Sequence, residues 1–181
     1  MKIALHGRNF KEEAKPYIQT LFNFLGEKNV EIQLSESFII FLTRNQVRLP
    51  SVSVYSEKEP LTQADFAFSI GGDGTLLEIL TQVGSLQIPI VGINTGRLGF
   101  LATTSPDEIL KNAADLFNRS FTIDERTLIR VESDKDIFDS INFGLNEFTI
   151  ARRDTSSMIT VRTYIDGEYL NSYWADGLIV S

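Results

Sequence analysis

The stretch DFAFSIGGDGTLLEIL, Asp65 to Leu80, decides the fold. Its apolar run FAFSI predicts a buried strand over Phe66–Ile70, and apolar residues recur at helical spacing from about Thr75 to Val83. Between them lies Gly-Gly-Asp-Gly, a glycine-rich turn of the kind that holds a phosphate at a helix N-terminus. The unusual member is Asp73, because a carboxylate and a phosphate repel each other.

Two arrangements make a carboxylate tolerable in such a turn. Asp73 can lie beside the phosphate as a general base that takes a proton from an attacking hydroxyl. Alternatively, a divalent cation such as Mg²⁺ can lie between the carboxylate and the phosphate oxygens. Both arrangements indicate phosphoryl transfer. The competing interpretation is a purely structural turn in which Asp73 caps the following helix. The sequence contains neither the dinucleotide fingerprint GxGxxG nor the phosphate loop GxxxxGK[ST].

Outward from this stretch, strands alternate with helices up to about Arg119. The predicted strands are 2–5, 30–34, 66–70 and 88–93, and the predicted helices are 12–28, 37–47, 75–83 and 105–117. Within the second helix, FIIFL alone reads equally well as a strand, and residues 49–63 are predicted to be mostly loop. This alternation predicts an α/β domain with a mostly parallel sheet over residues 1–120.

The pattern changes at Phe121, after which short apolar runs continue without a convincing helix. Asp166-Gly167 lies between two such runs and predicts a β-hairpin. Residues 121–181 are therefore expected to form the first part of an all-β, sandwich-like domain, which is too small to supply a sufficient core alone. Because the chain stops at Ser181 directly after the apolar run LIV, we expect it to be C-terminally truncated.

Composition limits the classes of partner. A net charge of −7 and the lack of a basic tract argue against nucleic acid and anionic membranes as partners. No apolar run approaches the roughly 20 residues of a membrane span. The sequence has 0 cysteines, which excludes disulfides, thiolate metal sites and thiol nucleophiles, and suits a cytoplasmic location. The single histidine, His6, is expected to be structural or solvated.

Further polar residues stand where strands are predicted to end. NTGRLGF, Asn94 to Phe100, is a second glycine-rich loop in which Arg97 can steady a phosphate or simply be solvated. Asn146 and Glu147 stand together inside an apolar run, so one of them is expected to face inward, unless the strand has an edge or a bulge there. Asp176 precedes a glycine, as a ligand contact or as part of a turn.

Four of these stretches together resemble the NAD kinase family. They are GGDGT at 71–75, NTGRLGFL at 94–101, LNEFTI at 145–150 and ADGLIVS at 175–181, in the family's order and at similar spacing. The resemblance implies transfer of a phosphoryl group from ATP, or from polyphosphate, to the 2′-hydroxyl of the adenosine ribose of NAD. It also implies a divalent cation, a homodimer or homotetramer, and a site between the two domains.

The resemblance assigns roles to individual residues. Asp73 would be the general base and Phe100 would line the adenine and ribose pocket, while Asp176 would contact the nicotinamide end or, across a subunit boundary, the bound dinucleotide. The remaining nucleotide-binding positions are Gly71, Gly72, Gly74, Thr75, Asn94, Arg97, Asn146, Glu147, Arg152 and Arg153. In this set, Asn146 would bond the adenosine portion and Glu147 a ribose hydroxyl. Many relatives carry Arg where this chain has Trp174.

Two alternatives stay open at this stage. Diacylglycerol and sphingosine kinases and phosphofructokinases use a similar GGDG turn, but they are not expected to carry NTGRLGFL or LNEFTI at these places. A non-catalytic dinucleotide-binding fragment would bind NAD without turnover.

Overall fold

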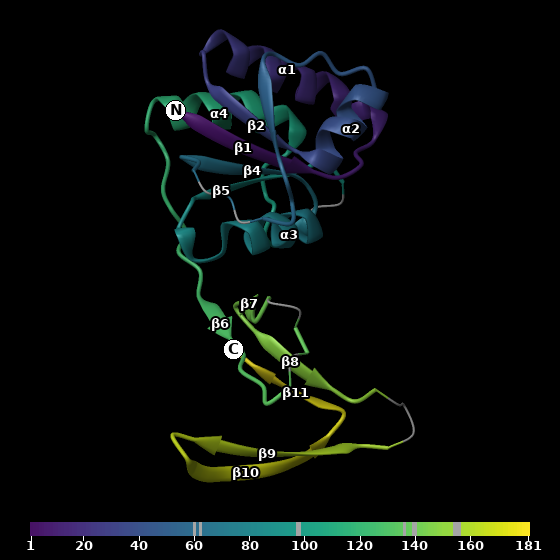
Figure 1. The fold of residues 1–181 in the computed structure, drawn as a ribbon, viewed down its shortest axis with the longest axis vertical. Helices are drawn as coiled ribbons and strands as arrows, with labels where there is room; N and C mark the ends of the chain where they lie inside the picture. The colour runs from purple at the N-terminus through teal and green to yellow at the C-terminus, as the bar shows by residue number, and fades with distance from the viewer. Residues whose placement is uncertain (60, 62, 97–98, 136, 139–140, 154–156) are drawn as a thin grey trace. The chain divides into compact units, whose positions relative to one another are not determined.

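The protein divides into two compact units, an N-terminal unit, Met1–Ile123, and a C-terminal unit, Asp124–Ser181. The structure is a computed structural model that describes residues 1–181 except 60, 62, 97–98, 136, 139–140 and 154–156 (Figure 1). The two units are described separately below.

A five-stranded sheet forms the centre of the N-terminal unit. Its strands are β1 (Lys2–Gly7), β2 (Glu31–Ser35), β3 (Val52–Tyr55), β4 (Phe66–Gly71) and β5 (Ile90–Asn94). They lie in the order β3-β2-β1-β4-β5, and every neighbouring pair is parallel. From β1 the chain adds strands on one side, out to β3, and then crosses back to add β4 and β5 on the other side of β1. The order in which strands are added therefore reverses between β1 and β4, although all strands are parallel.

Helices cover both faces of this sheet (Figure 1). They are α1 (Lys15–Glu27), α2 (Glu36–Arg44), α3 (Asp73–Val83) and α4 (Ile109–Phe117), with 3₁₀ turns at Glu12–Ala14, Gly84–Leu86 and Pro106–Glu108. The buried side chains of α1, α2 and α4 belong to one apolar cluster, whereas those of α3 belong mainly to a second cluster on the opposite face. The turn before α4 begins with a capping box between Ser105 and Glu108, which satisfies N–H groups that a helix start leaves unpaired.

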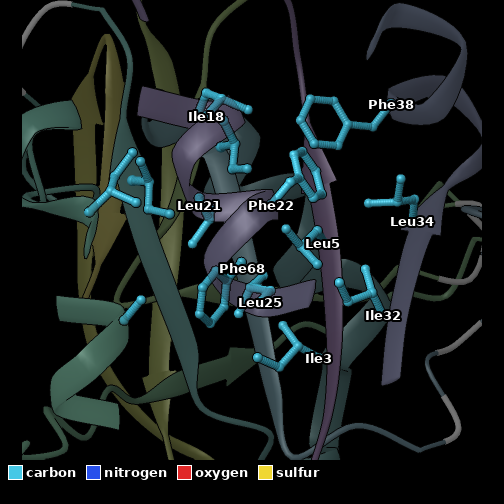
Figure 2. Close-up of a cluster of buried hydrophobic side chains, with 14 of the residues drawn as sticks. Ile3, Leu5, Ile18, Leu21, Phe22, Leu25, Ile32, Leu34, Phe38 and Phe68 are labelled. Atoms are coloured by element: carbon cyan, nitrogen blue, oxygen red, sulfur yellow. The ribbon is translucent and has the colours of Figure 1, made fainter. Parts of the chain in front are cut away.

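The larger cluster holds α1 against the sheet (Figure 2). Ile18, Leu21, Phe22 and Leu25 recur at helical spacing, so they share one face of α1, and all are 0% exposed. Figure 2 shows this face lying over apolar side chains of three strands, namely Ile3, Leu5, Ile32, Leu34 and Phe68. Burial of this stripe fixes α1 on the sheet, and with it the loop that connects β1 to α1.

The C-terminal unit consists of short antiparallel pairs. Its strands are β6 (Leu128–Arg130), β7 (Phe143–Leu145), β8 (Phe148–Ala151), β9 (Ile159–Ile165), β10 (Glu168–Ala175) and β11 (Gly177–Val180). They pair as β6–β7, β8–β11 and β9–β10. The β9–β10 hairpin turns through Asp166 (φ 51°) and Gly167 (φ 86°), whose left-handed conformations match the predicted two-residue turn.

The predicted fold class is confirmed, with differences in detail. FIIFL is part of helix α2, and α3 begins at Asp73 rather than near Thr75. The predicted loop at 49–63 contains the edge strand β3, and the all-β region predicted from residue 121 begins with the short strand β6. Of the helices that the structure describes, none combines the length and apolar character needed to cross a bilayer.

Candidate active site at the glycine turn

The glycine turn joins the carboxyl end of β4 to the first turn of α3. Gly72, the N-cap of α3, has φ −103° and ψ −167°, and neither Gly71 nor Gly74 is left-handed. These glycines therefore do not use the positive φ that glycine permits. Gly71 is required for a different reason, because an added Cβ would lie 2.2 Å from Thr75 Oγ1. Beside Gly72 and Gly74, an added Cβ would meet nothing within 4 Å, so the N-terminus of α3 is open to a ligand.

The Asp73 carboxylate binds the loop that follows β5. Its Oδ2 accepts a hydrogen bond from Phe100 N (2.8 Å), and its Oδ1 accepts bonds from Leu101 N (3.0 Å) and Ala102 N (2.9 Å). No side-chain cap bond is recorded at the start of α3, so the interpretation of Asp73 as a helix cap is not what the structure shows. The carboxylate instead joins the two glycine-rich stretches of the N-terminal unit.

These contacts favour the charged form of Asp73. The N–H groups of Ala102 and Phe100, followed by that of Leu101, lower the pKa of the Asp73 carboxyl below its usual 3.8, although partial burial opposes them. A carboxylate with a lowered pKa is a weaker base, but it stays negatively charged down to a lower pH. At neutral pH, Asp73 can therefore orient a hydroxyl or a cation without titrating itself.

The loop that contacts Asp73 is held from both ends. An added Cβ on Gly99 would lie 2.2 Å from Asp73 Oδ1, so glycine is needed for this approach. Asn94, which is 4% exposed, donates from Nδ2 to Ala102 O (3.2 Å), and its Oδ1 accepts from Gly96 N (2.8 Å). Asn94 thus has partners inside its own loop.

The same loop contains two other predicted positions, Phe100 and Arg97. Phe100, at the loop's tip, is 93% exposed. Arg97, the predicted phosphate contact, lies outside the described residues.

The residues of this site can supply only part of the ligand set that a divalent cation needs. In the described part of the chain, no group of three His, Cys, Asp or Glu side chains is arranged to hold a metal ion. A carboxylate offers about four lone-pair positions, and three of those of Asp73 are used by N–H groups, which leaves about one. Mg²⁺ in proteins is usually held by one or two carboxylates together with substrate phosphates. Asp73 therefore fits a cation that arrives with a phosphate ligand.

Asn146 and Glu147 do not lie inside a strand. They form the turn between β7 and β8, Asn146 has φ 65°, and both residues are exposed. Their N–H groups donate to Thr127 O and Leu145 O, at 2.9 and 2.8 Å. The expectation that one of the two side chains faces inward is therefore wrong, because the left-handed Asn146 interrupts the alternation of a strand.

Asp176 and Arg152 pair with each other in the C-terminal unit. Arg152 Nη1 lies 2.9 Å from Asp176 Oδ1, and Arg152 N donates to Asp176 O at 2.9 Å. Asp176 retains 71% of its side-chain exposure, Arg153 is exposed, and Trp174 is 73% exposed. The predicted positions therefore fall into two groups, one around Asp73 in the N-terminal unit and one in the segments that flank β8 and β11 in the C-terminal unit.

A polar network at the carboxyl edge of the sheet was not predicted from the sequence. Arg8 forms a two-pronged ion pair with Glu78 of α3, through Nε to Oε2 (2.8 Å) and Nη2 to Oε1 (2.7 Å). His6, which is 2% exposed, contacts the same Glu78 Oε2 at 2.9 Å and Ser35 Oγ at 3.0 Å. The signal that could have found this network is a basic residue directly after the first strand of a parallel sheet.

Two hollows lie at opposite edges of the sheet. The larger, about 540 Å³, is lined by Met1, Asp65, Phe66 and Phe121, next to the amino ends of β1 and β4. The smaller, about 220 Å³, is lined in part by Lys11, Thr95 and Gly96, next to their carboxyl ends. Ligands of open parallel sheets bind at the carboxyl edge, so the smaller hollow is the relevant one.

Comparison with known proteins identifies close relatives. The family profile described as the ATP-NAD kinase N-terminal domain matches residues 3–121. The chain is 52% identical, over its full length, to the NAD kinase of Cytophaga hutchinsonii, and 42% identical to that of Flavobacterium psychrophilum. A crystal structure of yeast NADH kinase complexed with NADH has the same fold, with a TM-score of 0.78 over 99% of this chain at 19% identity.

The chain is shorter than these relatives. It covers 62% of the Cytophaga hutchinsonii protein, 63% of the Flavobacterium psychrophilum protein and 56% of the yeast chain.

Proposed function

The chain belongs to the NAD kinase family, and we propose that it transfers a phosphoryl group from ATP, or from polyphosphate, to the 2′-hydroxyl of the adenosine ribose of NAD. The observation that carries the proposal is the Asp73 carboxylate, held in its charged form beside the open N-terminus of α3. The other enzymes considered, with a lipid or a sugar phosphate as acceptor, have no support in these similarities.

The glycine turn would receive the transferred phosphate. The first N–H groups of a helix have no partners within the helix, and the helix dipole adds positive potential there. The empty space beside Gly72 and Gly74 allows phosphate oxygens to approach these N–H groups. Phosphoryl transfer depends mostly on positioning and charge stabilisation, so such a cradle supplies much of what the reaction needs.

Asp73 would orient the acceptor hydroxyl and take its proton. As the 2′-oxygen forms its bond to phosphorus, the bond to the leaving phosphate oxygen breaks, and the hydroxyl proton passes to Asp73. A divalent cation, when bound, would neutralise charge on the phosphate oxygens, and those oxygens would be its main ligands.

The C-terminal unit would bind the dinucleotide, as a separate domain beginning near residue 121. Asn146 and Glu147 are exposed in their turn, so their side chains are available to the adenosine and its ribose hydroxyls. Arg152 and Arg153 would contact phosphate, and Asp176 the nicotinamide end or a dinucleotide bound by a neighbouring subunit. Phe100, exposed on its loop, would cover the adenine. A homodimer or homotetramer and a cytoplasmic location belong to the same proposal.

The test is formation of NADP from NAD, ATP and Mg²⁺, followed by mass spectrometry, with Asp73→Asn measured in parallel. Asparagine keeps the shape but removes the basicity, so we expect kcat to fall by roughly 10²–10⁴. If Asp73 serves mainly as the base, the dissociation constant of NAD stays nearly constant. If it serves mainly to hold the loop at 100–102, NAD binding weakens as well, because an amide cannot accept all of those hydrogen bonds.

The control is Asp115→Asn, which removes one carboxylate from α4, away from the turn. Full turnover by Asp73→Asn would contradict the role of Asp73 in catalysis. NAD binding without any turnover by the unmodified chain would instead identify a dinucleotide-binding fragment.

A further inference from the structure

We propose that the loop after β1 binds the phosphate chain of the donor, with Arg8 as its main ligand and with Glu78 and His6 as residues that position Arg8. This inference rests on the proposed function, since it names a donor-binding element of the same site. It adds the β1 loop to the glycine turn as a second element that contacts phosphate.

The first argument is the position of Arg8 in the sheet. It directly follows β1, and its main-chain N–H donates to Ile70 O at 3.1 Å, so it lies beside the end of β4, where the glycine turn begins. The order in which the chain adds strands to the sheet reverses between β1 and β4. In open parallel sheets, the crevice at such a reversal, at the carboxyl edge, is where ligands bind.

The second argument is that the Arg8 guanidinium is fixed before any ligand arrives. The guanidinium donates two hydrogen bonds to the Glu78 carboxylate, and Glu78 Oε2 also lies 2.9 Å from His6 Nε2. A carboxylate only accepts hydrogen bonds, so His6 Nε2 donates to Glu78, while His6 Nδ1 lies 3.2 Å from a second carboxylate, Glu57 Oε1. Since His6 is 2% exposed in the sheet, the chain of contacts runs from the buried interior to an exposed cation. Such preorganisation lowers the entropy cost of binding.

The third argument is the remaining binding capacity of Arg8. A guanidinium has five N–H groups, and the two bonds to Glu78 leave about three of them. The Arg8 side chain is 59% exposed, so these donors can reach a ligand. Glu78 lies about one and a half turns from the start of α3, so its partner Arg8 lies alongside the first turns of that helix.

The same loop contributes to the smaller hollow. Lys11 lines it together with Thr95 and Gly96 from the loop after β5, and with the carboxylates Glu13 and Asp107. Thr95 N donates to Gly71 O at 3.1 Å, so the loop after β5 lies beside the glycine turn. Lys11 is the second cation of the β1 loop, and it is a single point charge where Arg8 offers a planar fork of donors.

The competing interpretation is that Arg8 and Glu78 form only a structural ion pair, which exposed pairs often do with little effect. The two interpretations predict opposite results for Glu78→Gln. If Glu78 merely neutralises Arg8, removing its charge frees the cation and lowers the KM for ATP. If Glu78 positions Arg8, the same change releases the guanidinium and raises the KM for ATP.

The experiment measures KM and kcat for ATP and the dissociation constants of ATP, inorganic tripolyphosphate and NAD, on the full 181-residue chain. The variants are Arg8→Ala, Arg8→Lys, Glu78→Gln and the double variant Arg8→Ala with Glu78→Gln. The control is Arg44→Ala, which removes an exposed arginine from the last turn of α2, at the opposite edge of the sheet. Thermal unfolding checks that each variant is folded.

We expect Arg8→Ala to raise the KM for ATP by about tenfold to hundredfold and to leave NAD binding unchanged, as loss of charged hydrogen bonds predicts. Arg8→Lys should be intermediate, Glu78→Gln should raise the KM for ATP several-fold at unchanged kcat, and the double variant should match Arg8→Ala. Equal loss of ATP and tripolyphosphate binding would show that Arg8 contacts phosphate and not the adenosine.

Several results would overturn the inference. One is a KM for ATP in Arg8→Ala within about twofold of that in Arg44→Ala. Another is a lower KM for ATP in Glu78→Gln, and a third is an unmodified chain that binds neither ATP nor tripolyphosphate. Phosphate binding that depends on Arg8 in a chain that makes no NADP would support the inference and contradict the kinase proposal, so the two can fail separately.

Discussion

The N-terminal unit buries its apolar side chains, whereas the C-terminal unit leaves its own exposed. All buried hydrophobic residues among those the structure describes lie between Ile3 and Leu116. In the C-terminal unit, large apolar side chains such as Trp174 (73%), Ile179 (59%) and Tyr164 (57%) are exposed instead. The first unit therefore has a core of its own, and the second is held within this chain mainly by main-chain hydrogen bonds between paired strands.

This difference separates the two groups of predicted site residues. The Asp73 contacts and the Arg8 network are built on strands and helices that a core fixes, so their geometry belongs to the N-terminal unit alone. Asn146 and Asp176 lie in turns between strands that have no core beneath them. We therefore expect the segments around Asp73 and Arg8 to be rigid and the turns that contain Asn146 and Asp176 to be easily deformed in this chain.

The largest expected effect comes from truncating one large aromatic residue in each unit. Phe22→Ala leaves a cavity under α1, and we expect it to lower the free energy of unfolding by about 3–5 kcal/mol. Trp174→Ala removes a side chain that is 73% exposed, and we expect a change within about 0.5 kcal/mol. Urea denaturation followed by circular dichroism measures both. A similar loss in the two variants would mean that Trp174 is buried in solution and would break the comparison.

The same difference explains how much of the fold could be predicted. The strands and helices of the N-terminal unit were predictable because burial on one or both faces imposes a period on the sequence, as in Ile18, Leu21, Phe22 and Leu25. The edge strand β3 was missed because it is short and half-exposed, so Val52 and Val54 gave too brief an alternation. In the C-terminal unit, the first strand, β6, is only 3 residues long, because apolar runs without a core beneath them do not fix where a strand begins and ends.

The candidate site was predictable in its members but not in its contacts. The glycine turn and Asp73 stand out locally, because the sequence pattern around them is dense. Nothing in the sequence indicates that Asp73 accepts hydrogen bonds from main-chain N–H groups 27 to 29 residues away. The pairing of Arg8 with Glu78 is hidden for the same reason, since it depends on β1 lying next to β4. Strand order, which local patterns do not encode, determines both.

A second test compares a crowded glycine in each unit. An added Cβ on Gly71 would lie 2.2 Å from Thr75 Oγ1, and one on Gly177 would lie 2.4 Å from Ile150 O. Because Thr75 is itself buried, we expect Gly71→Ala to lower the free energy of unfolding by about 1–3 kcal/mol. Gly177→Ala should leave that free energy unchanged, since β11 can separate from β8 without disturbing the core.

Hydrogen exchange monitored by mass spectrometry distinguishes these outcomes, because it reports each unit separately. Gly177→Ala should accelerate exchange in β8 and β11 alone. Faster exchange in β1 and β4 of that variant would show that the C-terminal unit supports the N-terminal one, which the comparison does not predict.

The smallest expected effect compares one ion pair in each unit as a function of pH. The two hydrogen bonds from Arg8, with help from His6, hold the pKa of Glu78 below its usual 4.5. A carboxyl whose pKa is lowered by folding stabilises the folded state above its usual pKa and loses that effect as the pH falls through the lowered value. Glu78→Gln should therefore reduce the free energy of unfolding by about 1 kcal/mol at pH 7, after allowance for solvent screening of this partly exposed pair.

The matched change in the C-terminal unit is Asp176→Asn, which breaks the pair with Arg152. Because Asp176 retains 71% of its exposure, we expect no measurable change in the free energy of unfolding at any pH. Denaturation series between pH 3 and pH 7 compare the two variants with the unmodified chain. The deficit of Glu78→Gln should shrink below about pH 4.5 and vanish at the acid end. A deficit that persists there would mean that Glu78 acts through its packing rather than its charge, and Arg8 would lose its electrostatic anchor.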